Sequence, residues 1–229
     1  MNALFDYPQQ AKFGRIVAKN KIYNQVKPSR KIQDVFVSQV SKILWQYKLS
    51  PKTTNLPETY KVKEIEVFEI VLKPDIETKS IDKNILRCID KSIAHPIIFY
   101  LTYADKTKVI ATYKRPSEVD ATKWVISEEY FETDWLSAEL EHKKLPVVLN
   151  LSNLYEHILR ELIPLQAQEN ESLEKQIERM EQVIVKGKAV KKLETRMNRE
   201  KQFNRKVEMN ADLRSLNNEI EQLMNGVKV

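Results

Sequence analysis

The stretch PIIFYLTY, residues 96–103, is the longest unbroken apolar and β-prone run in the chain. It carries no charged residue and lacks the three- and four-residue spacing of an amphipathic helix. Such a run predicts a central strand that is buried on both faces. Amphipathic helical patterns precede it and short alternating segments follow it. Together they predict an α+β fold, with a small mixed sheet packed by helices.

Three segments before this strand extend the predicted domain. Residues 31–48 have apolar side chains at helical steps after a candidate N-cap, Ser29, and predict a helix. Residues 62–73 alternate and are rich in β-branched side chains, which predicts a strand. A second helix is expected over residues 80–93, capped by Ser80. Strand, helix and strand in this order predict a parallel crossover.

The segments after the central strand alternate between turns and short strands. A hairpin turn is expected at residues 104–107, followed by a strand at 108–113 and further strands at 124–126 and 130–133. Residues 151–163 have a helical apolar stripe that ends at Pro164. The predicted organisation is therefore a basic arm over residues 1–30, a globular domain over 31–164 and a tail over 165–229.

The apolar residues of the tail, residues 165–229, form a seam with three- and four-residue steps. This spacing predicts a long helical coiled coil. The seam slips in phase near Gly187 and then resumes. Two helices that fold back on each other satisfy this pattern, and so does one helix that pairs with a second copy. The second arrangement would make the protein a homo-oligomer through its tail.

Charge is unevenly distributed along the 229 residues, whose net charge is +6. Residues 1–63 hold 12 basic and 3 acidic side chains, residues 64–185 hold 15 and 23, and residues 186–206 hold 9 and 2. This layout suits phosphate binding at the basic ends, or association between unlike patches. The single cysteine, Cys88, and the lack of a membrane-length apolar stretch predict a soluble, cytoplasmic protein.

Several classes of chemistry are disfavoured by composition. The three glycines, Gly14, Gly187 and Gly226, belong to no phosphate-binding loop. One cysteine and three scattered histidines offer no recognisable zinc motif or thiol nucleophile. No cofactor and no metal site are expected on these grounds.

A metal-dependent nuclease is the enzymatic alternative, because it needs carboxylates and a lysine that converge at strand ends. The candidate catalytic pair is Glu69 and Lys73 in the predicted strand. Other acids and lysines of the same region, over residues 64–79, are Glu66, Asp75, Glu77 and Lys79.

The basic stretch of the tail is the candidate nucleic-acid-binding segment, because helical spacing spreads its charges over a broad surface. Its members are Lys186, Lys188, Lys191, Lys192, Arg196, Arg199, Lys201, Arg205 and Lys206. The alternative is a solvated coiled-coil exterior that pairs with Glu194, Glu200 and Glu208.

Four sequence blocks resemble a bacterial family known as domain of unknown function 4391. They are WQYKLSP at residues 45–51, FEIVLK at 68–73, YFETDW at 130–135 and REKQFNRKVEMN at 199–210. Where the family pattern has an Ile-Pro-Lys-type block, this chain has VAKNK at residues 17–21.

The resemblance implies a role in restriction-like antiviral loci, beside helicases and DNA methyltransferases. The first functional hypothesis is therefore a non-enzymatic accessory subunit. It would self-associate or dock to a helicase or methyltransferase, and contact DNA through the basic tail. The second hypothesis is the metal-dependent nuclease.

Overall fold

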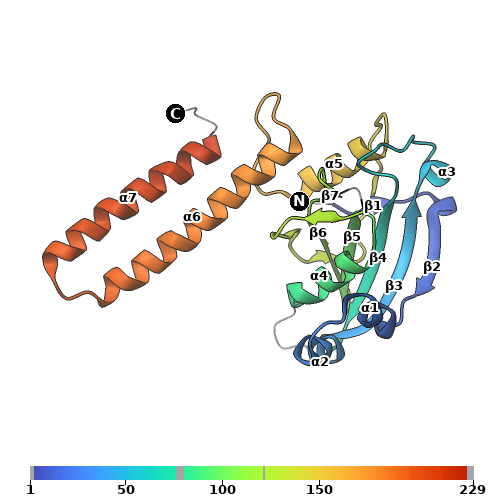
Figure 1. Ribbon diagram of the computed structural model, residues 1–229, viewed down its shortest axis with the longest axis horizontal. Coiled ribbons are helices and arrows are strands. Elements are labelled where there is room, and N and C mark those ends of the chain that lie inside the picture. Colours follow the sequence, from blue (N-terminus) through green and yellow to red (C-terminus); the bar gives the residue numbers. More distant parts are fainter. Residues whose placement is uncertain (1–2, 76–79, 121, 226–229) are drawn as a thin grey trace. The chain divides into compact units, whose positions relative to one another are not determined.

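The structure, a computed structural model, describes residues 3–75, 80–120 and 122–225. The chain divides into two compact units, Met1–Leu162 and Ile163–Val229, which we call the sheet unit and the hairpin unit. Figure 1 shows a sheet with helices in the first and two long helices in the second. The α+β class predicted from the sequence is confirmed.

A mixed seven-stranded sheet forms the centre of the sheet unit (Figure 1). Its strands are, in spatial order, β10 (Leu136–Ser137), β6 (Lys106–Ala111), β5 (Ile97–Tyr103), β4 (Ile65–Leu72), β3 (Val40–Leu49) and β2 (Lys12–Ile16), with β9 (Phe131–Glu132) also paired to β6. Strands β4 and β5 are parallel, and the other pairs are antiparallel. The PIIFYLTY stretch is thus an inner strand, as predicted.

The parallel crossover between β4 and β5 is also confirmed, and its helix is α4 (Lys83–Ser92). This helix begins later than expected: its N-cap is Asp82, whose carboxylate accepts a hydrogen bond from the Asn84 amide, and not Ser80. Buried α4 residues such as Ile85 and Ile89 share one core with Phe68 of β4.

The prediction of one helix over residues 31–48 is wrong in its second half. Helix α2 (Arg30–Gln39) begins after Ser29 as expected, but the chain then continues as strand β3. Register shifts in the β3–β4 pairing, between Val40 and Lys42 and between Trp45 and Tyr47, interrupt the two-residue alternation of the strand. The apolar spacing therefore imitates a helix.

The first thirty residues contribute several elements to the sheet unit. Strand β1 (Phe5–Asp6) pairs in parallel with β11 (Lys143–Lys144), a short helix η1 spans Gln9–Ala11, and β2 is the edge strand beside β3. Helix α1 (Lys19–Val26) adds Ile22 to the core on the α2 and α4 side of the sheet.

The remaining elements of the sheet unit close its edges. Helix α3 spans Pro51–Thr54, and β7 (Lys114–Pro116) pairs with β8 (Trp124–Ile126) in a separate ribbon. Helix α5 (Leu151–Leu162) packs beside β6 and β9 and buries an apolar stripe. Its Tyr155 hydroxyl accepts a hydrogen bond from the Lys114 amide and donates one to the Thr112 carbonyl.

The hairpin unit consists of α6 (Leu173–Arg199) and α7 (Phe203–Asn225), which pack against each other (Figure 1). Of the two arrangements that the seam allows, the chain adopts the fold-back of two helices. Leu173 and Ile177 of α6 and Leu213 of α7 are buried. Within the described residues, no helix combines the length and the apolar character that a membrane crossing needs.

Candidate functional site

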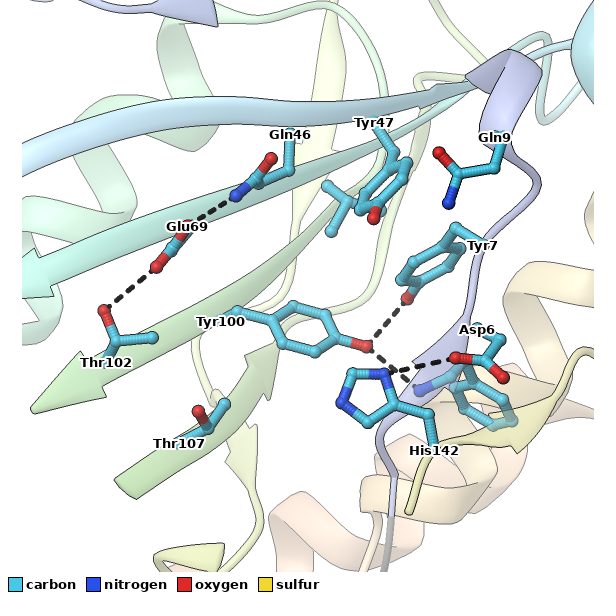
Figure 2. Close-up of a pocket in the computed structure, with 12 residues that line it drawn as sticks. Asp6, Tyr7, Gln9, Gln46, Tyr47, Glu69, Tyr100, Thr102, Thr107 and His142 are labelled. Atoms are coloured by element: carbon cyan, nitrogen blue, oxygen red, sulfur yellow. Dashed lines mark hydrogen bonds and ion pairs between the residues drawn. The ribbon is translucent and has the colours of Figure 1, made fainter. Parts of the chain in front are cut away.

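A pocket of about 480 Å³ opens on one face of the sheet in the sheet unit. Alternation along β4 creates it: Phe68 and Ile70 join the core beneath the helices, whereas Val67 and Glu69 face the pocket. The lining comes from β1, β3, β4, β5, β6 and nearby turns (Figure 2), and comprises Phe5, Asp6, Tyr7, Gln9, Gln46, Tyr47, Val67, Glu69, Tyr100, Thr102, Thr107 and His142.

Glu69, one of the predicted catalytic residues, lies in this pocket with both carboxylate oxygens engaged. Gln46 Nε2 donates to Oε2 at 2.5 Å, and Thr102 Oγ1 donates to Oε1 at 3.2 Å. Figure 2 shows this trio at one end of the pocket and His142 with Asp6 at the other. The hydrogen bonds satisfy the carboxylate that alternation places among apolar neighbours.

Tyr7 and Tyr100 form the middle of the pocket. The hydroxyl oxygens of these two side chains are 3.1 Å apart, and the Phe5 amide donates to Tyr100 Oη at 3.3 Å. Burial raises the pKa of Tyr100 to about 12, and burial followed by the neighbouring Tyr100 raises that of Tyr7 well above its usual value. Both phenols stay protonated at neutral pH, so they can bind a polar ligand but cannot serve as bases.

The other predicted catalytic residues do not join Glu69. Lys73 follows the end of β4, where its amide donates to the Gln39 carbonyl at 2.9 Å, and it is not part of the pocket lining. Burial, and then the charge of Lys73, lower the pKa of Lys19. Asp75 is exposed, and Glu77 and Lys79 lie outside the described residues.

A cluster of charged side chains lies at a different edge of the sheet unit, where β4 and β5 begin. Glu64, Glu66 and His95 can place one ligand atom each within 4.8 Å of one another, and among the described residues no other group of acids, histidines and cysteine has such spacing. Glu66 is fully buried, and Trp45 Nε1 donates to its Oε2 at 2.8 Å. Lys48 Nζ lies 2.8 Å from Glu64 Oε2.

Burial determines the protonation of this cluster. It raises the pKa of Glu66 to about 7, with a further contribution from the neighbouring Glu64 carboxylate. Burial also lowers the pKa of His95, so its imidazole is neutral at pH 7. Buried ionisable groups with shifted pKa values are typical of functional sites.

A buried lysine lies close to the cluster. The Lys114 ammonium donates to the carbonyls of Asp90 and Ile93 at the end of α4, where the helix dipole favours a cation. Its Nζ is 3.8 Å from Asp90 Oδ1, and Tyr130 donates to the other carboxylate oxygen at 2.6 Å. Burial lowers the pKa of Lys114 to about 8.

Sequence reasoning did not find the Glu64, Glu66 and His95 cluster, although a signal was present. The predicted crossover makes β4 and β5 parallel neighbours, and Glu66 pairs with Ile97. Glu64, two residues before Glu66, and His95, two residues before Ile97, are therefore expected side by side just before the two strands begin. This inference requires the register of the pairing between β4 and β5, and the alternation of apolar and polar residues along each strand does not determine that register.

The predicted nucleic-acid-binding residues lie in the hairpin unit, from the middle of α6 through the turn to the start of α7. Seven of the nine are exposed, and Lys186 and Lys206 are partly buried. Lys186 forms an ion pair with Glu219, and Arg205 lies 3.8 Å from Glu200. In the described part of the chain, Arg196, Arg199 and Lys201 have no acidic side chain within ion-pair distance.

Comparison with known proteins identifies the family. A family model described as Domain of unknown function (DUF4391) matches residues 5–220, and no curated protein or solved structure matches the chain. The matched range contains all four sequence blocks of the resemblance and extends from β1 into α7. The chain therefore belongs to the DUF4391 family.

Proposed function

We propose that the protein is a non-enzymatic accessory subunit that contacts DNA through the exposed basic residues of its hairpin unit. The observation that carries the proposal is a row of cations on α6. Lys188, Lys192, Arg196 and Arg199 follow at steps of four, four and three residues and are all exposed. They share one side of the helix over about 16 Å, because an α-helix rises about 1.5 Å per residue.

A row of this kind suits a phosphate backbone. Duplex DNA carries about one negative charge per 1.7 Å of axis, and neutralising phosphates with Lys or Arg releases condensed counterions. Arg205 and Lys206 add further positive charge at the start of α7, and Lys201 adds it in the turn. Such contacts bind without reading base sequence, because they touch the backbone alone.

The partner side of the proposal rests on the family resemblance, which implies neighbours such as a helicase or a DNA methyltransferase in a restriction-like antiviral locus. Exposed apolar side chains in the hairpin unit support a protein contact as well: Val185, Phe203 and Val207 are 64%, 78% and 52% exposed. Association with a second copy through this unit is part of the proposal. Light scattering behind size-exclusion chromatography checks it, and Phe203→Ser should favour the monomer.

The test of DNA contact compares two variants with equal loss of charge. Lys192→Gln, Arg196→Gln and Arg199→Gln together neutralise the row, whereas the control variant neutralises the exposed Lys31, Lys83 and Lys91 of the sheet unit. Fluorescence anisotropy with labelled duplex and single-stranded DNA is recorded at several salt concentrations. We expect the first variant to lower the slope of log K against log salt by about 2 to 3, at roughly 0.9 per lost phosphate contact.

Two outcomes contradict the proposal. Equal binding by the wild type and both variants would remove the row from the contact surface. Cleavage of the same DNA with Mg²⁺ or Mn²⁺, abolished by Glu69→Gln, would favour the nuclease alternative. The geometry gives that alternative less support, because Glu69 is held by Gln46 and Thr102 and lies outside the acid and histidine cluster.

A further inference from the structure

The cluster of Glu64, Glu66 and His95 contains polar atoms that the described residues leave without partners. Glu66 Oε1 and His95 Nδ1 are both buried and have no hydrogen-bond partner there. Buried polar atoms are nearly always paired, so each unpaired one calls for a physical explanation. Here two such atoms belong to side chains that are also spaced as metal ligands.

We propose that Glu64, Glu66 and His95 bind one divalent transition-metal ion, with Zn²⁺ as the best match. Imidazole nitrogen and carboxylate oxygen are both good zinc ligands, at about 2.0 to 2.2 Å from the ion. Ligand atoms on a tetrahedral ion of this size are about 3.4 Å apart. Atoms already within 4.8 Å of one another reach that spacing by small side-chain rotations.

Strand geometry explains why these side chains converge. Glu64 immediately precedes β4 and Glu66 is its second residue, so the two-residue spacing brings both carboxyl groups to one side of the chain. His95 immediately precedes Pro96 and β5, the parallel neighbour of β4. The antiparallel neighbour β3 places Lys48 opposite Glu66, from which it reaches Glu64. Glu66 is thus held within β4, and Glu64 and His95 lie in the backbone just before β4 and β5.

Charge and access are compatible with an ion. Glu64 and Glu66 supply the negative charge for a divalent cation, which competes with the Lys48 ammonium, 2.8 Å from Glu64 Oε2, and with the charge of the buried Lys114. The side chains of Glu64 and His95 are 24% and 27% exposed, which leaves an entry path, while Glu66 is enclosed. Three protein ligands leave a fourth position for water, as in zinc sites that are not purely structural.

The test uses the full chain after dialysis against a chelator. Zn²⁺ is titrated calorimetrically, and Co²⁺ is added in parallel because its visible absorption reports imidazole coordination. We expect one Zn²⁺ per chain, and at least tenfold weaker binding in both Glu66→Gln and His95→Gln, since even outer-shell changes cost about 10- to 100-fold. Lys48→Gln should bind Zn²⁺ more tightly, because it frees the Glu64 carboxylate.

Matched controls come from the other two histidines, which also lie beside acids. His142 is 3.5 Å from Asp6 and His157 is 3.7 Å from Glu161. His142→Gln and His157→Gln should bind Zn²⁺ like the wild type. Equal Zn²⁺ affinity in the wild type and His95→Gln would overturn the proposal, as would no binding at all.

Folding of each variant is checked by circular dichroism before titration. Should Glu66→Gln fail to fold, Glu64→Gln serves in its place, because Glu64 is partly exposed. All ligands belong to the sheet unit, whereas the DNA contact rests on the hairpin unit. Failure of one proposal therefore leaves the other unaffected.

Discussion

Lys114 and Asp90 form an ion pair in the interior of the sheet unit, with 3.8 Å between Nζ and Oδ1 and side-chain exposures of 0% and 1%. Burying two charges costs solvation that their attraction offsets only with further hydrogen bonds. The Asp90 and Ile93 carbonyls accept hydrogen bonds from the ammonium and the Tyr130 hydroxyl donates to Asp90 Oδ2, whereas Asp90 Oδ1 has no hydrogen bond among the described residues and faces the ammonium alone. The ion pair connects β7, which contains Lys114, to the C-terminal end of the crossover helix α4, which contains Asp90.

Removing one member of this pair should cost more than removing both. We expect Lys114→Met to lower the free energy of unfolding by about 3 to 5 kcal/mol, because Asp90 is left buried without its cation. Lys114→Met combined with Asp90→Asn should lose at least about 1 kcal/mol less than the sum of the single changes. Urea unfolding of the four proteins at pH 7 measures this, and strict additivity would contradict the coupling.

Asp90 should make stability depend on pH in mild acid. Burial raises its pKa from 3.8 to about 6, while Lys114, Tyr130 and Arg87 oppose that shift. The folded state therefore keeps this proton to higher pH than the unfolded state, and stability is lost as pH rises from about 4 to 6. The loss over that range is on the order of a few kcal/mol.

Asp90→Asn removes this titration, so the stability difference between variant and wild type should change across that pH range. Urea midpoints measured from pH 4 to 7 give the difference. Glu132→Gln, at a more exposed position, is the control and should follow the wild type. A flat difference curve for Asp90→Asn would show that the carboxyl titrates normally.

Tyr100 should stabilise the β1 segment through its hydroxyl. Tyr100→Phe leaves the Phe5 amide without its acceptor and Tyr7 without its hydroxyl partner. We expect a loss of about 1 to 2 kcal/mol, the usual cost of an unpaired buried group. Tyr47→Phe, in the same pocket, should change stability by less than about 0.5 kcal/mol. Hydrogen exchange at the Phe5 amide gives the local readout.

Arg179 should stabilise the end of the hairpin unit where α6 begins and α7 ends. Its guanidinium binds both Glu171 carboxylate oxygens at 2.7 Å, and it donates to the Leu223 and Gln166 carbonyls, also at 2.7 Å. A lysine cannot reproduce this planar fork. Arg179→Lys should therefore raise hydrogen exchange in the last turns of α7, whereas the exposed Arg214→Lys should not.

Gly187 weakens the middle of α6. A Cβ built at this position has no heavy atom within 4 Å, so alanine fits without strain. Gly187→Ala should raise stability by about 0.5 to 1 kcal/mol, because glycine loses more backbone entropy in a helix. Ala189→Gly, at an exposed site of the same helix, should lower it by a similar amount. Thermal unfolding measures both, and a destabilised Gly187→Ala would contradict this account.

The secondary structure was predictable where one kind of periodicity persisted. The unbroken run of β5, the apolar stripe of α5 and the seam of α6 and α7 each identified their elements. Prediction failed at the junction of α2 and β3, after Gln39, because β-bulges disrupt alternation there. Similarly, Asp82 replaced Ser80 as the cap of α4, since several nearby residues can cap a helix.

The sequence by itself determined the α+β class, the inner strand, the crossover and the basic helical tail, because these follow from local periodicity and charge. Tertiary structure alone decided which side chains meet. Glu69 and Lys73 are close in sequence yet do not share the pocket, whereas His95 joins Glu64 across thirty-one positions. Strand order and register determine which side chains come into contact. Both depend on the packing of the whole core.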